Sequence, residues 1–190
     1  MTSDPVPRGA RWIVVAILAT LTWQYARLPI DGSGETGFLH LPNLVFHEAG
    51  HWILMPLGRF MSVLGGSLMQ VLVPVVCSIA FLRRDNPFGA AVCIWWAGQN
   101  LVDLAPYIAD ARRLQIVLLG GFTGAEVEGH DWEYLLATLG WLRYDMTLGR
   151  TAQAAGALVM AGATIWTVLL LLPARRTDTS ASTSAGRGTP

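Results

Sequence analysis

The residues best placed to do chemistry are two histidines and a glutamate in the run HEAGH, residues 47–51. On a helix, residues four apart share a face, so the imidazoles of His47 and His51 can bind one metal ion. Zinc is the expected metal, because two imidazoles, a carboxylate and a water form a catalytic zinc site. Glu48 then lies beside the open coordination position and can accept a proton from metal-bound water. The pattern predicts a metal-dependent hydrolytic centre with Glu48 as its general base.

A third protein ligand has to come from another part of the chain, and Asp110 is the first candidate. A carboxylate completes a two-histidine zinc site well. His130 and Asp131 are the next candidates, although an ordinary loop position for His130 and a helix cap for Asp131 are equal alternatives. Asp103 precedes Asp110 by about two helical turns, or roughly 10 Å along the axis, and can instead be a hydrogen-bond partner of a ligand.

Two further polar residues accompany these candidates. Asn100 can donate a hydrogen bond to a substrate carbonyl or to a developing oxyanion, although a structural bond between helices is an equal alternative. His40 precedes the HEAGH run and is expected at the membrane interface rather than on the metal. Asn100 therefore stays a catalytic candidate, and His40 is left out of the predicted ligand set.

The composition favours a bilayer protein over a soluble one. Hydrophobic residues make up 53% of the 190 residues, charged residues only 14%, and there are eight tryptophans. Thirteen basic residues, all arginine, balance thirteen acidic ones, so no basic surface is available for a nucleic acid. Cys77 and Cys93 fall in apolar segments without a CxxC spacing, which indicates buried side chains rather than a disulfide or a cysteine zinc site.

The apolar segments predict an all-α integral membrane protein with about four to five apolar helices. These segments occupy residues 12–28, 42–57, 68–82, 88–111 and 152–172. The second segment is the HEAGH helix, and its roughly 16 residues rise only about 24 Å. Because the hydrocarbon core is roughly 30 Å thick, this helix is too short to cross it completely.

The stretch from residue 111 to residue 151 is the longest that is not predicted to span the bilayer. Its second half has apolar residues at helical spacing, which predicts an amphipathic helix lying at the interface. These residues are Trp132, Leu135, Leu136 and Leu139. Residues 1–172 are expected to form one membrane-embedded domain, and the polar residues 173–190 a disordered tail.

The arginines constrain how the apolar segments cross the bilayer. If every segment crossed completely, His47 and Asp110 would lie at opposite faces and the arginines would not sort by side. Both problems are resolved if the HEAGH helix enters partway and residues 58–67 return as a re-entrant loop. The N-terminus, the RRD turn and the C-terminal tail then share an arginine-rich face, which the positive-inside rule makes cytoplasmic. The predicted site opens toward the other side of a membrane that we expect to be the bacterial cytoplasmic membrane.

The HEAGH run resembles the HExGH form found in the site-2 protease type of intramembrane zinc metallopeptidases, peptidase family M50. The later run NLVDLAPYIADA is similar to the second motif of that family, in which an asparagine and a proline precede an aspartate ligand. By position, Asn100 and Pro106 match the asparagine and the proline, and Asp110 matches the ligand. Ala111 follows where the family usually has glycine, and the spacing from the asparagine is looser. The resemblance covers about residues 42–111, and family members usually open their site toward the cytoplasm.

We therefore expect a membrane-embedded zinc metalloendopeptidase that hydrolyses peptide bonds in or near the bilayer by metal-activated water. His47, His51 and Asp110 would bind Zn²⁺, and Glu48 and Asn100 would be the catalytic residues. The expected partners are the lipid bilayer and a membrane-protein or peptide substrate, with no nucleic acid. The alternative is a non-catalytic metal-binding membrane protein with a structural or partner-binding role, which a site closed by four protein ligands would favour.

Overall fold

The computed structural model describes residues 7–33 and 37–173. Within these ranges the regular secondary structure is helical, and one isolated antiparallel bridge joins Val117 and Thr123. The α-helices are α1 (Arg8–Tyr25), α2 (His40–Leu54), α3 (Arg59–Leu82), α4 (Pro87–Ala109), α5 (Asp131–Thr138) and α6 (Asp145–Leu171). Two short 3-10 helices, η1 (Met55–Leu57) and η2 (Leu142–Tyr144), precede α3 and α6. The all-α prediction is confirmed. The predicted disordered tail lies outside the described residues, except for Pro173.

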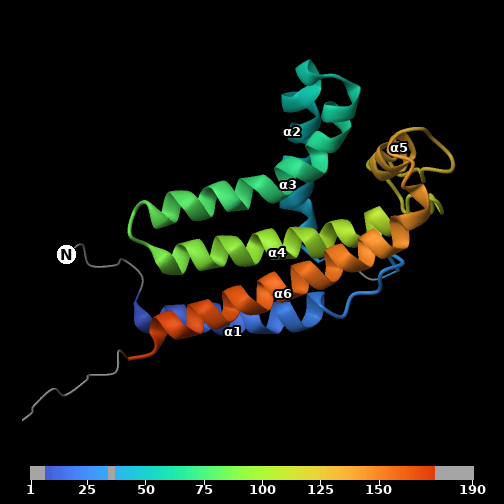
Figure 1. Ribbon diagram of the computed structural model, residues 1–190. Coiled ribbons are helices and arrows are strands. Elements are labelled where there is room, and N and C mark those ends of the chain that lie inside the picture. Colours follow the sequence, from blue (N-terminus) through green and yellow to red (C-terminus); the bar gives the residue numbers. More distant parts are fainter. Residues whose placement is uncertain (1–6, 34–36, 174–190) are drawn as a thin grey trace, which may run out of the picture.

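Four long helices, α1, α3, α4 and α6, form the body of the molecule, with α4 between α3 and α6 (Figure 1). The largest buried cluster joins α1, α4 and α6, and its members are Leu18, Tyr25, Trp95, Val102, Met160 and Ala163. A Cβ on Gly98 of α4 would lie 2.9 Å from the carbonyl oxygen of Gly156 on α6. The backbones of α4 and α6 therefore approach closely, as small residues permit in membrane helix pairs.

Among the described residues, two helices are long and apolar enough to cross a membrane: α3 and the stretch Leu142–Leu171, which comprises η2 and α6. This is fewer than the four to five predicted. The helix α1 begins with Arg8 and Arg11, and the second half of α4 carries Gln99, Asn100 and Asp103. These groups are costly in hydrocarbon and lower the apolar character of both helices.

Residues 58–67, predicted as a re-entrant loop, are helical except for Gly58. Gly58 has a φ of 96°, and α3 begins at the next residue and continues to Leu82. The chain changes direction at Gly58 because glycine adopts a positive φ at no steric cost. The short α2 and the long α3 are therefore joined by η1 and a tight turn at Gly58, and residues 58–67 do not form the predicted re-entrant loop.

The paired glycines that suggested a loop have a packing role instead. A Cβ on Gly65 of α3 would collide with the carbonyl oxygen of Gly50 on α2, and a Cβ on Gly50 would collide with that of Gly65. The two backbones are thus in direct contact. This contact holds α2 against the first turns of α3.

The two ends of the molecule carry different segments. The start of α1, the turn between α3 and α4 and the end of α6 lie at one end (Figure 1). The helices α2 and α5 and the segment between α4 and α5 lie toward the other end (Figure 1). This grouping of segments matches the predicted one, and it arises because α2 is short and α3 alone returns the chain to the first end.

Two smaller predictions concern residues within this fold. The predicted amphipathic helix is α5, which buries Leu135 and Leu136, and its Trp132 indole donates a hydrogen bond to Ser67 Oγ of α3 at 3.1 Å. Cys77 and Cys93 are free thiols; Cys93 is buried, as predicted, whereas Cys77 is only partly buried.

Candidate metal centre

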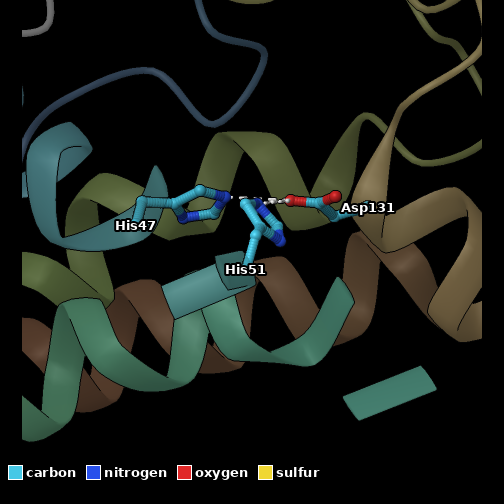
Figure 2. Close-up of side chains that lie close together, drawn as sticks. All are labelled: His47, His51 and Asp131. Carbon is cyan, nitrogen blue, oxygen red and sulfur yellow. Dashed lines mark hydrogen bonds and ion pairs between the residues drawn. The ribbon is translucent and has the colours of Figure 1, made fainter. Parts of the chain in front are cut away.

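Three side chains from two distant segments converge at one point: His47 and His51 of α2, and Asp131 of α5 (Figure 2). Asp131 Oδ2 lies 2.9 Å from His47 Nε2 and 3.3 Å from His51 Nε2. Two ligand atoms that are each about 2.1 Å from a tetrahedral zinc lie about 3.4 Å apart. Both Asp131 distances are close to this spacing, and the three ligand atoms all lie within 4.8 Å of one another, as a shared metal ion requires.

The two histidines share a face of α2, as their spacing of four predicts. Their rings meet edge to face, with centroids 4.9 Å apart. The His47 side chain is 7% exposed and that of Asp131 12%, whereas His51 is 23% exposed. A carboxylate and two imidazoles in such a sheltered position need a compensating charge, which either a proton or a divalent cation can supply.

Hydrogen bonds to α3 fix the outer nitrogens of both rings. His47 Nδ1 lies 3.0 Å from Gln70 Oε1, and His51 Nδ1 lies 2.9 Å from the carbonyl oxygen of Ser62. Both partners are acceptors, so each Nδ1 carries a proton and donates it. Each Nε2 is then the nitrogen available to a metal, which is the usual arrangement in zinc sites.

Gly66 of α3 makes room for the two imidazoles. A Cβ at this position would lie 2.5 Å from His47 Nε2 and 2.7 Å from His51 Cε1. Sequence reasoning missed this role, although the glycine pair at residues 65–66 was the available signal. Gly65 allows α2 to approach α3, and Gly66 leaves space for the side chains that α2 carries.

A proton and a metal ion would compete for the same imidazole nitrogens of this site. The hydrogen bond to Asp131 raises the pKa of His51 to about 9, although burial lowers it. The nearby charge of Glu48 also raises this pKa. Burial alone would raise the pKa of Asp131, but its hydrogen bonds to His47 and His51 outweigh burial and lower it. A proton thus occupies the position between imidazole and carboxylate that a metal ion would take.

Asp110, the first-choice third ligand, is not brought to the histidines. It follows the last residue of α4 and is fully buried, and its Oδ2 accepts a hydrogen bond from the Ile116 N–H at 2.8 Å. The same oxygen lies 3.6 Å from His130 Nε2. Asp110 therefore holds the segment that leads away from α4, and the carboxylate at the histidines belongs to Asp131.

Of the roles left open for His130 and Asp131, the structure gives the helix cap to His130 and places the Asp131 carboxylate beside His47 and His51. His130 is the N-cap of α5, because its Nδ1 accepts a hydrogen bond from the Glu133 N–H at 3.1 Å. The predicted cap, Asp131, is the first residue of the helix, and its backbone N–H donates to the Tyr107 hydroxyl at 2.9 Å. Since His130 provides the cap, the Asp131 carboxylate is free to face α2.

Asn100 and Asp103 lie on α4 but differ in their relation to the centre. Asn100 is buried, its Nδ2 donates to the Trp96 carbonyl at 3.0 Å, and it does not line the cavity described below. Asp103 accepts a hydrogen bond from Gln70 Nε2 at 3.0 Å, and Gln70 in turn contacts His47. Asp103 thus contacts His47 only through Gln70, as expected for a hydrogen-bond partner and not for a ligand. His40 contacts Asp103 and not the metal group.

The three side chains open onto a cavity of about 950 Å³. Glu48 and Tyr107 line this cavity together with the metal group, which brings the predicted general base to the same space. Residues 115–119 and the segment around Asp31 line it as well. Tyr107 is a second residue that sequence reasoning missed, and no motif in the chain indicated it.

Comparisons with protein-family models, with curated proteins and with solved structures give no match. The function of this chain is therefore inferred from its own residues.

Proposed function

We propose that this protein is a membrane-embedded zinc metalloendopeptidase that resembles family M50 and hydrolyses peptide bonds in or near the bilayer. The convergence of His47, His51 and Asp131 beside Glu48 in one cavity is the observation that supports this most directly. Three protein ligands leave a coordination position for water, as in catalytic zinc sites. A non-catalytic site closed by four protein ligands is the alternative, and a group of three among the described residues favours catalysis.

Each residue of the centre then has a role in hydrolysis. The bound zinc supplies an activated water and polarises the substrate carbonyl. Glu48 accepts the proton of the attacking water and passes it to the amine that leaves when the C–N bond breaks. The Tyr107 hydroxyl lines the cavity and contacts the backbone of Asp131, so it is better placed than Asn100 to donate to the developing oxyanion.

An extended segment with one isolated antiparallel bridge in the cavity wall supports a peptide substrate. Val117 faces Thr123 in the antiparallel bridge, and the flanking Leu118 N–H donates to the Phe122 carbonyl. In this pattern Val117 belongs to a non-hydrogen-bonded pair, so its own N–H and C=O point away from the hairpin. An extended peptide can pair with such an edge through its main chain. The wall therefore suits a polypeptide in extended conformation.

We further propose that the chain is an integral protein of the bacterial cytoplasmic membrane with both termini in the cytoplasm. Large apolar side chains are exposed along α1 and α6, among them Ile13, Ile17, Leu158 and Ile165. Arg8 and Arg11 at the start of α1, and Arg83 and Arg84 in the turn between α3 and α4, lie at the end remote from the cavity. By the positive-inside rule this end is cytoplasmic, so the metal centre lies toward the opposite side and α2 does not cross the bilayer.

Zinc analysis and proteolysis by the purified protein test this function. Wild-type protein in detergent should contain one zinc per chain and cleave fluorescein-labelled casein or a quenched peptide with one apolar segment. Glu48→Gln should keep its zinc and lose cleavage, because it removes the base and no ligand. Cleavage retained by purified Glu48→Gln would contradict the mechanism, and wild-type protein without affinity for zinc would contradict the metal centre.

A further inference from the structure

A buried chain of hydrogen bonds connects His47 to Asp103 through Gln70. His47 Nδ1 lies 3.0 Å from Gln70 Oε1, and Gln70 Nε2 donates to Asp103 Oδ2 at 3.0 Å. Gln70 is 3% exposed and the Asp103 side chain 4%. The three residues belong to α2, α3 and α4, so the chain ties all three helices to one imidazole.

The glutamine amide can face His47 in two ways, and they have opposite effects on the ring. With Oε1 toward the ring, Nδ1 must carry the proton and Nε2 is left as a metal ligand. With Nε2 of the amide toward the ring, Nδ1 must accept, and the proton moves to the ring nitrogen that faces Asp131. Asp103 Oδ2 accepts from the NH₂ group of Gln70, so the oxygen end of the amide faces His47.

Asp103 is itself held by donors from α2. Asn43 Nδ2 lies 3.1 Å from Asp103 Oδ2, and His40 Nδ1 lies 3.0 Å from Oδ1. The Trp96 indole donates to Asn43 Oδ1 at 2.8 Å, which orients the Asn43 amide with its NH₂ group toward Asp103. Together with Gln70 Nε2, these two groups place three hydrogen-bond partners on the one carboxylate. The acceptor that selects the Gln70 orientation is thus fixed in place.

We propose that Asp103, acting through Gln70, is a positioning residue that sets the tautomer and rotation of His47 for metal binding. This inference rests on the proposed metal function of His47. Hydrogen-bond partners behind zinc ligands typically contribute roughly 10–100-fold to metal affinity. Asp103 never touches the metal in this arrangement, and its effect is transmitted by one amide group.

Cobalt titration tests the proposal, because the visible spectrum of Co²⁺ reports both affinity and ligand geometry. Asp103→Leu removes the acceptor and should weaken Co²⁺ binding roughly 10–100-fold with a changed spectrum. Asp103→Asn should recover most of the affinity, since its amide oxygen can still accept from Gln70. Ser78→Ala is the matched control, because Ser78 Oγ also donates across a buried α3–α4 contact, to the Ala90 carbonyl at 3.1 Å. This control should bind Co²⁺ like the wild type.

Wild-type affinity and spectrum in Asp103→Leu would overturn the proposal, and so would an equal loss in Ser78→Ala. If circular dichroism shows that Asp103→Leu does not fold, Co²⁺ binding by Gln70→Met and Gln70→Glu tests the proposal instead. Methionine removes the acceptor for His47 and should weaken Co²⁺ binding, whereas glutamate keeps one and should retain it. Equal binding by these two variants would overturn the proposal. Wild-type protein that binds no Co²⁺ would overturn the metal centre as well, so the two failures are distinguishable.

Discussion

Asp131 Oδ2 lies 2.9 Å from His47 Nε2, although 84 residues separate the two in the chain. Four features of the fold bring them together. The contact between α2 and α3 holds His47, Gly66 leaves it space, His130 caps α5, and the Tyr107 hydroxyl holds the backbone N–H of Asp131. Each of these features can be tested separately from the ligands themselves.

Asp131→Ala should remove zinc from the protein, whereas Asp110→Asn should leave the zinc content unchanged. Removal of Asp131 deletes a ligand and should abolish stoichiometric zinc in protein purified and then dialysed against a mild chelator. Asp110→Asn keeps an oxygen that can accept from the Ile116 N–H and should retain about one zinc per chain. Elemental analysis of both variants measures the difference. The reverse order of zinc loss would identify Asp110 as the ligand.

Gly66→Ala should destroy the centre while most of the fold is kept. Its Cβ would meet both imidazoles, so the rings have to move away from Asp131. Such overpacking typically costs about 1–3 kcal/mol of folding stability. We expect zinc affinity to fall at least roughly 100-fold by chelator competition, on the scale of a lost supporting contact. Gly162→Ala on α6 is the matched control, because a Cβ there meets nothing within 4 Å. Equal zinc affinity in the two variants would refute the steric role of Gly66.

Zinc affinity should rise with pH up to about 9. Asp131 raises the pKa of His51 to about 9, so below that pH the metal-free protein holds a proton on His51. Zinc has to displace this proton, and its apparent affinity should fall about tenfold for each pH unit below 9. Competition against a chelator of known protonation constants at pH 6–9 measures the slope. A flat profile across this range would show that His51 binds no metal or holds no proton.

Removal of zinc should lower the thermal stability of the protein, and added zinc should restore it. A ligand that binds only the folded state at 100 times its dissociation constant adds about 2.7 kcal/mol. The melting temperature should therefore rise with zinc concentration in the wild type and in Glu48→Gln, and it should not rise in the double variant His47→Ala, His51→Ala. An equal zinc-dependent rise in the double variant would place the stabilising metal elsewhere.

The part of the site that follows from local spacing could be predicted from the sequence. His47, Glu48 and His51 lie within five residues of one helix, so their mutual placement depends only on helical geometry. The length of α2 and its location toward the end of the molecule opposite the arginine-rich turn also followed from a count of apolar residues. Two spans instead of four to five were found because residues such as Asp103 make α4 less apolar than its length suggests.

Which carboxylate lies beside His47 and His51 could not be chosen from the sequence, because it depends on the path of the segment between α4 and α5. Asp110 and Asp131 are both acidic, and both lie on the same side in the predicted topology. The choice between them depends on two hydrogen bonds, from the Ile116 N–H to Asp110 and from the Glu133 N–H to His130. Neither bond can be recognised in the sequence. Histidine is an uncommon N-cap, and a backbone N–H can be supplied by almost any residue.

The separation between α2 and α5 along the chain also sets the order in which the protein can become active during synthesis. Ribosomes add about 5–20 residues per second, so Asp131 emerges about 4–17 s after His47. During that interval the nascent chain carries both histidines and Glu48 but no third ligand. Under the proposed function, hydrolysis can therefore begin only after Asp131 has been added to the chain.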